Sequence, residues 1–340
     1  MDWSVAPGYG ASDVGPTMTD RRPLTLMTVH AHPDDETIGT GGAMAQAVRD
    51  GRRVVLVTCT RGEMGEIVVP EMDTPDNHRR LGELRAAELE AAMAELGVTE
   101  WENLGYRDSD MMGRPANHDP RSFWRADLDE AAGRLTWLIR RHRPDVVTTY
   151  NAFGGYGHPD HIRTHDVAIR AFARAGEPAW YPEQLATEHG GTGPAEAEGG
   201  LAPWAPAKLY EQAIPSSVRE EMRRRLAAQG FRARWSKPES GSSSGDAARP
   251  PRLKKHVPDD AITTKVPIED LLDLKFRALA HHVTQMGPGS AFVTFGPAGW
   301  RSLWPYESFI LRESRVATTP PESDLFAGLR ADRRAYHRHG

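Results

Sequence analysis

Residues 24–36 read LTLMTVHAHPDDE, an apolar run that ends in two histidines and three carboxylates. An unbroken apolar run of this kind predicts a strand that is covered on both faces of a sheet. The acids that follow are typical of a helix start, because Asp is a favoured N-cap and negative charge is stabilised in the first turn. The stretch therefore predicts a buried strand over 24–29 that leads directly into a helix over 35–50.

The same alternation continues along the chain, as it does in βαβ units built on a parallel sheet. Further strands are expected at 54–58, 101–105 and 145–150, and further helices at 78–96, 126–142 and 159–176. Beyond 176 the pattern weakens, with strands near 208–214, 262–266 and 308–312 and helices near 218–229 and 268–282. The sequence thus predicts an α/β fold, a Rossmann-like and mostly parallel sheet with helices on both faces.

Composition divides the 340 residues into four parts. We expect 1–22 to be a disordered leader, 23–176 the Rossmann-like catalytic core, and 317–340 a tail. Between them, 177–316 is expected to be a smaller C-terminal α+β portion that completes the sheet and walls the active-site cleft. Inside that portion, 236–260 (SKPESGSSSGDAARPPRLKKHVPDD) has the composition of a mobile insertion.

The bulk composition excludes several classes of partner. A net charge of -5, with Lys and Arg spread along the chain, does not fit a nucleic-acid-binding protein. No apolar run approaches the roughly 20 residues that span a bilayer, and the N-terminal residues lack the apolar segment of a signal peptide. The single cysteine, Cys59, fits a reducing compartment and buried strand packing. We therefore expect a cytoplasmic protein without a membrane partner; the sequence leaves homo-oligomerisation open.

A second His-Pro-Asp tripeptide follows the strand expected at 145–150, in GGYGHPDH at 154–161. Ligands of open parallel sheets bind in the crevice at the carboxyl ends of the strands. Both His-Pro-Asp tripeptides occupy such positions. The sequence therefore predicts that the two loops meet in one site.

Helix capping alone does not account for the acids of the first loop. A helix dipole offsets about 0.3–1 kcal/mol for one acid, whereas two carboxylates about 4 Å apart near a protein surface repel by about 4 kcal/mol. A cation would remove that repulsion. Imidazoles combined with carboxylate suit Zn²⁺ or a similar first-row metal, and Fe²⁺ fits these ligands too.

Three protein ligands with one open position are typical of a catalytic zinc. His32 and Asp35 would come from the first loop and His161 from the second. His158 and His161 lie three residues apart and would share one face at a helix start. One of these two histidines would bind the metal, which leaves the other free for substrate.

Two other readings compete with a metal site. GTGG at 39–42 prompts a nucleotide-binding Rossmann module, but these glycines fall inside the expected helix and follow three acids that would repel a pyrophosphate. A serine hydrolase is weaker still, because the sequence contains no G-x-S-x-G.

The paired motifs HAHPDDE and GGYGHPDH resemble those of the LmbE-like (PIG-L) family of zinc-dependent de-N-acetylases, which has a Rossmann-like fold with an HPDD and a later HxxH motif. Three further stretches are similar to the branch that deacetylates N-acetylglucosaminyl-inositol in mycothiol biosynthesis and to mycothiol-conjugate amidases: TCTRGEMGEI at 58–67, GYRDSDMMG at 105–113 and FWRADLDEA at 123–131. The resemblance is dense over 24–175 and thin afterwards.

For the metal, the resemblance implies that His32, Asp35 and His161 are the ligands of a zinc ion. It also implies that Asp34 is the general base, which takes a proton from the attacking water.

For the substrate, the resemblance makes His158 the group that stabilises the tetrahedral intermediate and protonates the leaving amine. Tyr156 matches a tyrosine near the family's site, and Asp160 is expected to orient His158. The substrate implied is a small amino sugar.

Weaker expectations concern side chains that follow other strands or a late helix and could hydrogen-bond a sugar. The expected substrate contacts are Glu63, Glu66, Arg107, Asp108, His282 and Gln285. The alternative is that the loop residues are solvated charges and that His282 and Gln285 only complement the C-terminus of their helix.

Two positions depart from the family pattern near the expected cleft. Asn151 stands where the inositol deacetylases have an aspartate, and Gly39 stands where the conjugate amidases have a lysine. The leading expectation is a deacetylase of an N-acetylglucosaminyl substrate, with the conjugate amidase as its rival.

Overall fold

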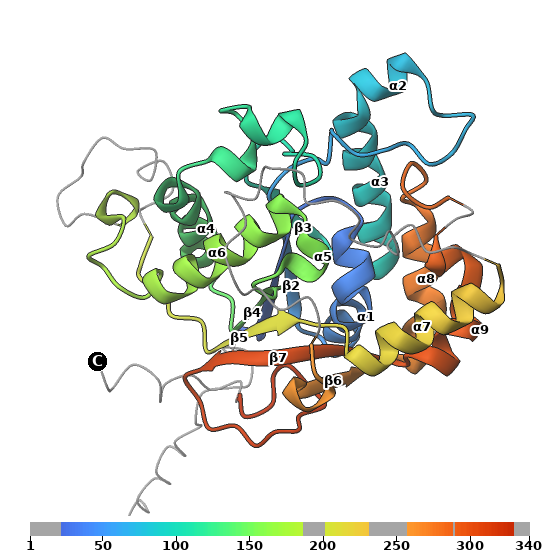
Figure 1. The fold of residues 1–340 in the computed structure, drawn as a ribbon. Coiled ribbons are helices and arrows are strands. Elements are labelled where there is room, and N and C mark those ends of the chain that lie inside the picture. Colours follow the sequence, from blue (N-terminus) through green and yellow to red (C-terminus); the bar gives the residue numbers. More distant parts are fainter. Residues whose placement is uncertain (1–21, 186–200, 231–256, 288–289, 330–340) are drawn as a thin grey trace, which may run out of the picture.

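The sheet at the centre of the molecule confirms the α/β fold. A computed structural model describes residues 22–185, 201–230, 257–287 and 290–329 (Figure 1). Its strands run in the order β3-β2-β1-β4-β5-β7-β6. They are β1 (Thr25–His30), β2 (Arg53–Thr58), β3 (Glu100–Asn103), β4 (Val146–Tyr150), β5 (Lys208–Gln212), β6 (Thr264–Pro267) and β7 (Tyr306–Ser314). The first five are parallel, while β7 runs antiparallel to β5 and β6.

Helices cover both faces of this sheet (Figure 1). One face carries α1 (Asp35–Arg49), α3 (Leu81–Leu96) and α8 (Leu272–Ala280), and the other carries α4 (Leu128–His142) and α6 (Pro159–Arg174). The remaining α-helices are α2 (Pro75–Arg79), α5 (Gly154–Gly157), α7 (Ser216–Ala228) and α9 (Ala291–Leu303). None of the helices in the described ranges is both long and apolar enough to cross a membrane.

The residues of β1 show why helices must pack on both faces of the sheet. Leu26 belongs to the core that contains Met44 of α1, whereas the next residue, Met27, belongs to the core that contains Ile139 of α4. All four side chains are fully buried. Successive strand residues point to opposite faces, so a continuous apolar strand is stable only between two layers of helices.

A buried ion pair in the C-terminal portion forms hydrogen bonds with the backbone of α1. Lys275 of α8 and Glu307 of β7 lie 2.7 Å apart, with side chains at most 2% exposed. Glu307 accepts hydrogen bonds from the backbone amides of Gly42 and Ala43 at 2.9 Å, and Lys275 donates to the carbonyl of Ile38 at 2.8 Å. The glycines of GTGG at 39–42 therefore lie inside a helix, as expected, and that helix packs against charged side chains.

The structure differs from the expected elements in two places. The helix expected over 78–96 is two helices, because the chain leaves helical geometry at Arg80, which lies between α2 and α3. Helix α9 was not expected, because its sequence contains Pro297 after Gly296, and the backbone does kink at that glycine (φ 57°). Glycine and proline disfavour a helix interior, which hides such a helix from sequence reasoning.

The expected divisions outside the core fall partly beyond the described residues. The insertion at 236–260 is described only from Val257, which bridges to Pro215. Of the leader, Arg22 is described, and it pairs with Asp145 at 2.9 Å. Residues 317–329 of the expected tail pack on the domain, since Phe326 is 4% exposed. Cys59 is buried, as expected.

Candidate metal centre

The two His-Pro-Asp loops meet at the carboxyl ends of β1 and β4, which are neighbours in the sheet. The Oδ2 atom of Asp35 lies 3.2 Å from the Nδ1 atom of His32 and 3.2 Å from the Nε2 atom of His161. Ligand atoms held about 2.0 Å from a tetrahedral zinc lie about 3.3 Å apart. Asp35 thus lies at about this ligand spacing from each of the two histidines, which fits the prediction that these three side chains hold one metal ion.

The ring of His161 is oriented for a metal by the loop before it. Its Nδ1 atom lies 3.1 Å from the carbonyl oxygen of Gly154, so the ring donates Nδ1–H and carries its lone pair on Nε2. That Nε2 atom is buried and has no hydrogen-bond partner within the described residues. The ring of Tyr150 stacks on it with centroids 4.2 Å apart. A buried nitrogen lone pair that makes no hydrogen bond and faces a carboxylate oxygen is the atom that a cation would satisfy.

Asp160 was expected to orient His158; its backbone N–H does bond that ring, while its carboxylate holds His32. The Nε2 atom of His32 lies 3.2 Å from Oδ2 of Asp160, which leaves Nδ1 toward Asp35. Asp160 is fully buried and also accepts hydrogen bonds from the backbone amide and hydroxyl of Ser109. A carboxylate behind a ligating histidine fixes the ring and raises its basicity.

The charges around His32 favour a cation at this point. Burial opposes protonation of the ring, but the carboxylates of Asp108, Asp160 and Asp35 together raise its pKa well above the ordinary value. The pKa of Asp35 is held well below its usual range, because His161 and His32 outweigh the effect of burial. The carboxylates that stabilise a proton on His32 would stabilise the charge of a bound divalent metal in the same way.

His158 adds a third imidazole to the site. One ring nitrogen from each of His32, His158 and His161 lies within 4.8 Å of the others. The Nδ1 atom of His158 accepts the backbone N–H of Asp160 at 3.2 Å, so a neutral ring carries its proton on Nε2. Burial, with the nearby His32 and His161, lowers the pKa of His158 well below its ordinary value. The neutral ring is therefore a hydrogen-bond donor through Nε2.

Asp34 has a strained backbone and a buried carboxyl group. Its φ of 101° is a conformation that costs a non-glycine residue about 1–3 kcal/mol. Burial raises the pKa of its carboxyl group to about 7, against the opposing effect of Arg85. The Oδ1 atom of Asp34 lies 3.2 Å from Nη2 of Arg85. Arg85 also donates from Nη1 to the carbonyl oxygen of Gly62 and from Nη2 to that of Pro33. A general base works best with a pKa near the operating pH.

His282, an expected substrate contact, is instead buried within the protein. It is 0% exposed, and its Nε2 atom lies 3.0 Å from Oε1 of Glu36, which is also 0% exposed. Glu36 in turn accepts the backbone N–H of Asp34 at 2.9 Å. Because both side chains are enclosed, His282 does not reach a substrate in the cleft.

Asp108 and its neighbours form the rim between the second and third strands. Asp108 is 3% exposed, and its Oδ1 atom lies 3.7 Å from Nε2 of His32. Burial raises its pKa, but the imidazoles of His32 and His158 lower it to about 2. Glu63 accepts the backbone N–H of Asp108 at 3.2 Å, and Arg107 lies 3.6 Å from Asp119. Asp108 is thus beside the ligands, while Arg107 is turned toward another acid.

The two remaining expected contacts lie together at the loop after β2. Gln285 donates to the backbone carbonyl of Glu66 at 3.0 Å and to the hydroxyl of Thr284 at 3.1 Å. Glu66 is exposed. Tyr156, by contrast, lies at the ligands, with its ring centroid 4.8 Å from that of His161.

Sequence reasoning missed Arg85, Ser109 and Tyr150. Arg85 is 4% exposed and lies on the buried stripe of α3 between Leu81 and Leu89, one turn away on each side. A charged residue on an apolar helix face is the one pattern that could have revealed it. Ser109 and Tyr150 act through partners distant in the chain, so no local pattern marks them.

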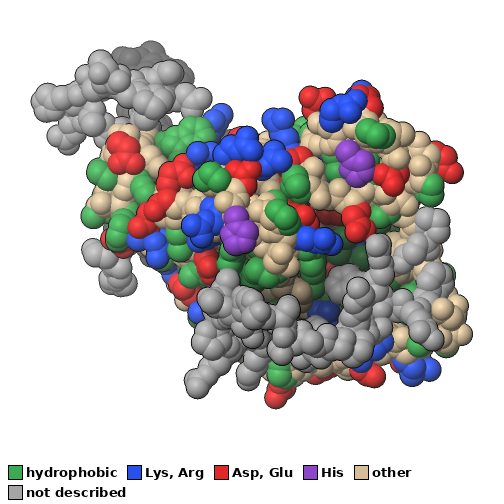
Figure 2. All heavy atoms as spheres, turned by 45° about the horizontal axis from the view of Figure 1, so that its top comes forward, with side chains coloured by type: hydrophobic (Ala, Val, Ile, Leu, Met, Phe, Trp, Pro, Cys, Tyr) green, Lys and Arg blue, Asp and Glu red, His purple; other side chains and the backbone are tan. Residues whose placement is uncertain are grey.

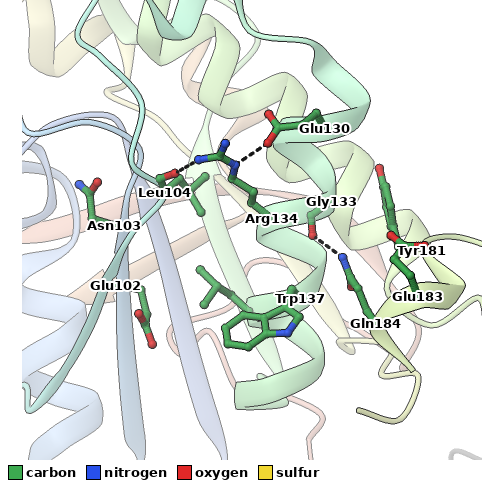
Figure 3. Close-up of a pocket in the computed structure, with 11 residues that line it drawn as sticks. Glu102, Asn103, Leu104, Glu130, Gly133, Arg134, Trp137, Tyr181, Glu183 and Gln184 are labelled. Atoms are coloured by element: carbon green, nitrogen blue, oxygen red, sulfur yellow. Dashed lines mark hydrogen bonds and ion pairs between the residues drawn. The ribbon is translucent and has the colours of Figure 1, made fainter. Parts of the chain in front are cut away.

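Neither the surface nor a pocket beside α4 suggests another site for the predicted residues. Figure 2 shows a face on which Lys and Arg side chains are interspersed with Asp and Glu. A pocket of about 460 Å³ lies beside α4, where Trp137 faces Glu102 and Arg134 bonds Glu130 (Figure 3). None of the predicted site residues lines that pocket.

Comparison of the sequence with known proteins gives one consistent result. The family described as "PIG-L: GlcNAc-PI de-N-acetylase" matches residues 27–172. The chain is 45% identical over 323 residues to 1D-myo-inositol 2-acetamido-2-deoxy-alpha-D-glucopyranoside deacetylase of Thermomonospora curvata, covering 92% of this chain and 98% of that protein. It is 39% identical over 314 residues to deacetylase 1 of the same name from Frankia casuarinae, covering 89% and 94%.

Solved structures share the fold at low sequence identity. N,N'-diacetylchitobiose deacetylase from Pyrococcus horikoshii superposes with a TM-score of 0.55 at 20% identity, covering 86% of this chain and 84% of that one. 4-Carboxy-2-hydroxymuconate hydratase from Pseudomonas putida gives 0.52 at 17% identity, covering 87% and 99%. Because a hydratase and a deacetylase share this fold, the structural similarity is evidence for the fold and not for an activity.

Proposed function

Because this chain belongs to the PIG-L family and is a deacetylase, we propose that it removes the N-acetyl group from an N-acetylglucosaminyl-inositol, on the mycothiol route, with a zinc ion at the candidate centre. The relatives covered along nearly their whole length are named for this substrate. The reaction is hydrolysis of an amide, which releases acetate and a primary amine.

The observation that carries the proposal is the convergence of His32, Asp35 and His161 on one point. Oδ2 of Asp35 lies 3.2 Å from a ring nitrogen of each histidine, about the ligand spacing of a tetrahedral zinc site, and Nε2 of His161 makes no hydrogen bond within the described structure. Zinc bound there supplies a Lewis acid that lowers the pKa of water to about 7 and polarises an acyl oxygen. Fe²⁺ suits the same ligands.

The chain's own side chains would then move the protons. Asp34, with its pKa raised by burial, takes the proton from the attacking water. A protonated His158 hydrogen-bonds the oxyanion and then gives that proton to the departing nitrogen, which returns the ring to the neutral form that burial favours. Tyr156, beside His161, and Asp108, beside His32, lie where they can hydrogen-bond the sugar.

Two positions bear on the choice between deacetylase and conjugate amidase. A side chain at Gly39 would begin 2.0 Å from Oε1 of Gln212, so a lysine there, as expected of the amidases, requires the flexible end of Gln212 to turn away. Asn151 accepts the backbone amides of Phe153 and Gly155 at 3.1 Å through Oδ1. An aspartate would supply the same acceptor, so this departure preserves the loop that carries Tyr156.

The test is metal analysis combined with assays on one preparation of enzyme. We expect one zinc or iron per chain, and release of acetate from N-acetylglucosaminyl-inositol at a kcat/KM at least about tenfold above that for free N-acetylglucosamine or a mycothiol S-conjugate. A preference for the S-conjugate would replace the proposal by the amidase. Full activity after complete removal of metal would refute the metal site.

A further inference from the structure

The strained backbone of Asp34 needs an explanation from its surroundings. Its φ of 101° and ψ of -37° place it just before α1, where a residue with ordinary backbone geometry could also begin a helix. Residues keep such conformations only when several contacts impose them. Its side chain is held by Arg85 at 3.2 Å, and its backbone N–H is held separately by Glu36 at 2.9 Å.

Glu36 makes an unusual cap at the start of α1. Its Oε2 atom accepts the backbone N–H of Asp34, two residues earlier in the chain. Its Oε1 atom accepts the hydroxyl of Thr37 at 2.7 Å. In a capping box a Glu in the first turn likewise reaches back to the N-cap amide. The carboxylate of Glu36 therefore fixes the peptide plane from which the Asp34 side chain projects.

His282 holds this carboxylate from the other side. It follows α8, and its Nε2 atom lies 3.0 Å from Oε1 of Glu36. Both side chains are 0% exposed. A buried carboxylate is unfavourable unless it is paired, so the imidazole of His282 is what allows Glu36 to remain ionised beside Asp34.

We propose that Glu36 and His282 are positioning residues, a buried pair that holds Asp34 in its strained conformation and thereby aims its carboxylate at the reacting water. The role assumes the proposed function, in which Asp34 is the general base. Neither residue touches the substrate. The pair acts on the rate of the chemical step, because displacing a catalytic group by about 1 Å can cost about 10²-fold.

The chain offers a graded set of variants for the test. Glu36→Ala removes the acceptor for the Asp34 amide. Glu36→Gln keeps an acceptor oxygen, and its amide NH₂ can donate to Nε2 of His282 if the ring proton moves to Nδ1, an atom without a partner in the described structure. Glu211→Ala is the matched control, because Glu211 pairs with His165 at 3.2 Å and both residues are 8% exposed.

We expect zinc-loaded Glu36→Ala to bind the metal fully, to lose kcat by about 10- to 100-fold and to keep KM within about threefold. Glu36→Gln should recover kcat to within about fivefold of wild type, and Glu211→Ala should stay within about threefold. In a crystal structure of Glu36→Ala, Asp34 should have a negative φ. If Glu36→Ala does not fold, His282→Asn, whose amide is too short to reach Glu36, replaces it with the same expectations.

Three results would overturn the proposal: a kcat of wild-type size in Glu36→Ala, an unchanged φ at Asp34, or loss of metal instead of rate. The crystallographic readout does not depend on the substrate. A wild-type enzyme that deacetylates none of the assayed sugars would count against the proposed function, while the backbone of Asp34 in Glu36→Ala would still decide the positioning role.

Discussion

The Oδ2 atom of Asp35 lies 3.2 Å from the Nε2 atom of His161, so the carboxylate at the start of α1 and the imidazole at the start of α6 face one point. Neither atom can be moved far, since Asp35 begins a helix gripped by Lys275 and Glu307, and His161 is tied to the carbonyl of Gly154. Under the proposed function, these two side chains would bind the metal without rearrangement of the backbone.

Removal of His161 should remove the metal and the activity together. We expect His161→Ala to retain less than about one tenth of the wild-type zinc after dialysis, because only two of the three protein ligands of a catalytic site remain. Atomic absorption on the purified protein measures this. His165→Ala, one helical turn further along α6, is the control and should keep its metal. Stoichiometric zinc in His161→Ala would show that His158 is the ligand.

Asp160 should affect metal affinity without contacting the ion. In Asp160→Asn the carboxylate that accepts from Nε2 of His32 is lost, and we expect zinc to bind about 10- to 100-fold more weakly. Competition with a chelator gives the Kd. Asp166→Asn, a partly exposed acid on the same helix, serves as the control. Equal affinities in Asp160→Asn and wild type would mean that the orientation of His32 does not depend on Asp160.

Asp34→Asn should separate metal binding from rate. The amide cannot take a proton, so we expect full zinc content and a kcat lower by about 10² or more, the usual scale for a general base. Steady-state deacetylation with metal analysis on the same sample provides both numbers. If the variant turns over at the wild-type rate, another group takes the proton from water.

The buried ion pair under α1 should be sensitive to loss of one partner. Glu307→Ala leaves Lys275 buried without its counter-charge, and we expect unfolding to become easier by about 3–5 kcal/mol. Urea unfolding measures the difference. Replacing both residues by apolar ones should recover part of the loss. Glu220→Ala, which removes an exposed pair with Arg223, should cost no more than about 1 kcal/mol; a similar cost at both sites would contradict this picture.

His165 should make stability depend on pH away from the metal. Burial opposes its protonation, but Asp166 and Glu211 raise its pKa above the ordinary 6.5. A raised pKa in the folded state stabilises the protein fully below pH 6.5, and the contribution disappears as the pH rises through the folded-state value. The difference in Tm between wild type and His165→Asn should therefore shrink between pH 6 and 9, in zinc-saturated samples. A difference that grows with pH would show that the ring is neutral in the fold.

The sequence by itself determined the layers of the fold and the place of the site. Leu26 and Met27 are neighbours in one apolar run, and a run buried on both sides requires helices on both faces of a sheet. Each His-Pro-Asp motif follows a strand, and the carboxyl ends of neighbouring parallel strands meet at one edge. These are consequences of local periodicity, which can be read without knowing any contact.

Only the tertiary structure decided how the site is held. Asp160 is hydrogen-bonded to His32, 128 residues away in the sequence, and His282 to Glu36, 246 residues away. The sequence predicted the contact of Asp160 with His158, which the backbone N–H of Asp160 makes, but neither the bond from its carboxylate to His32 nor the buried pairing of His282 with Glu36. A hydrogen bond depends on the position and angle of two particular atoms, and the packing of distant segments sets these, whereas the burial of apolar surface is roughly proportional to area and leaves a pattern along the chain.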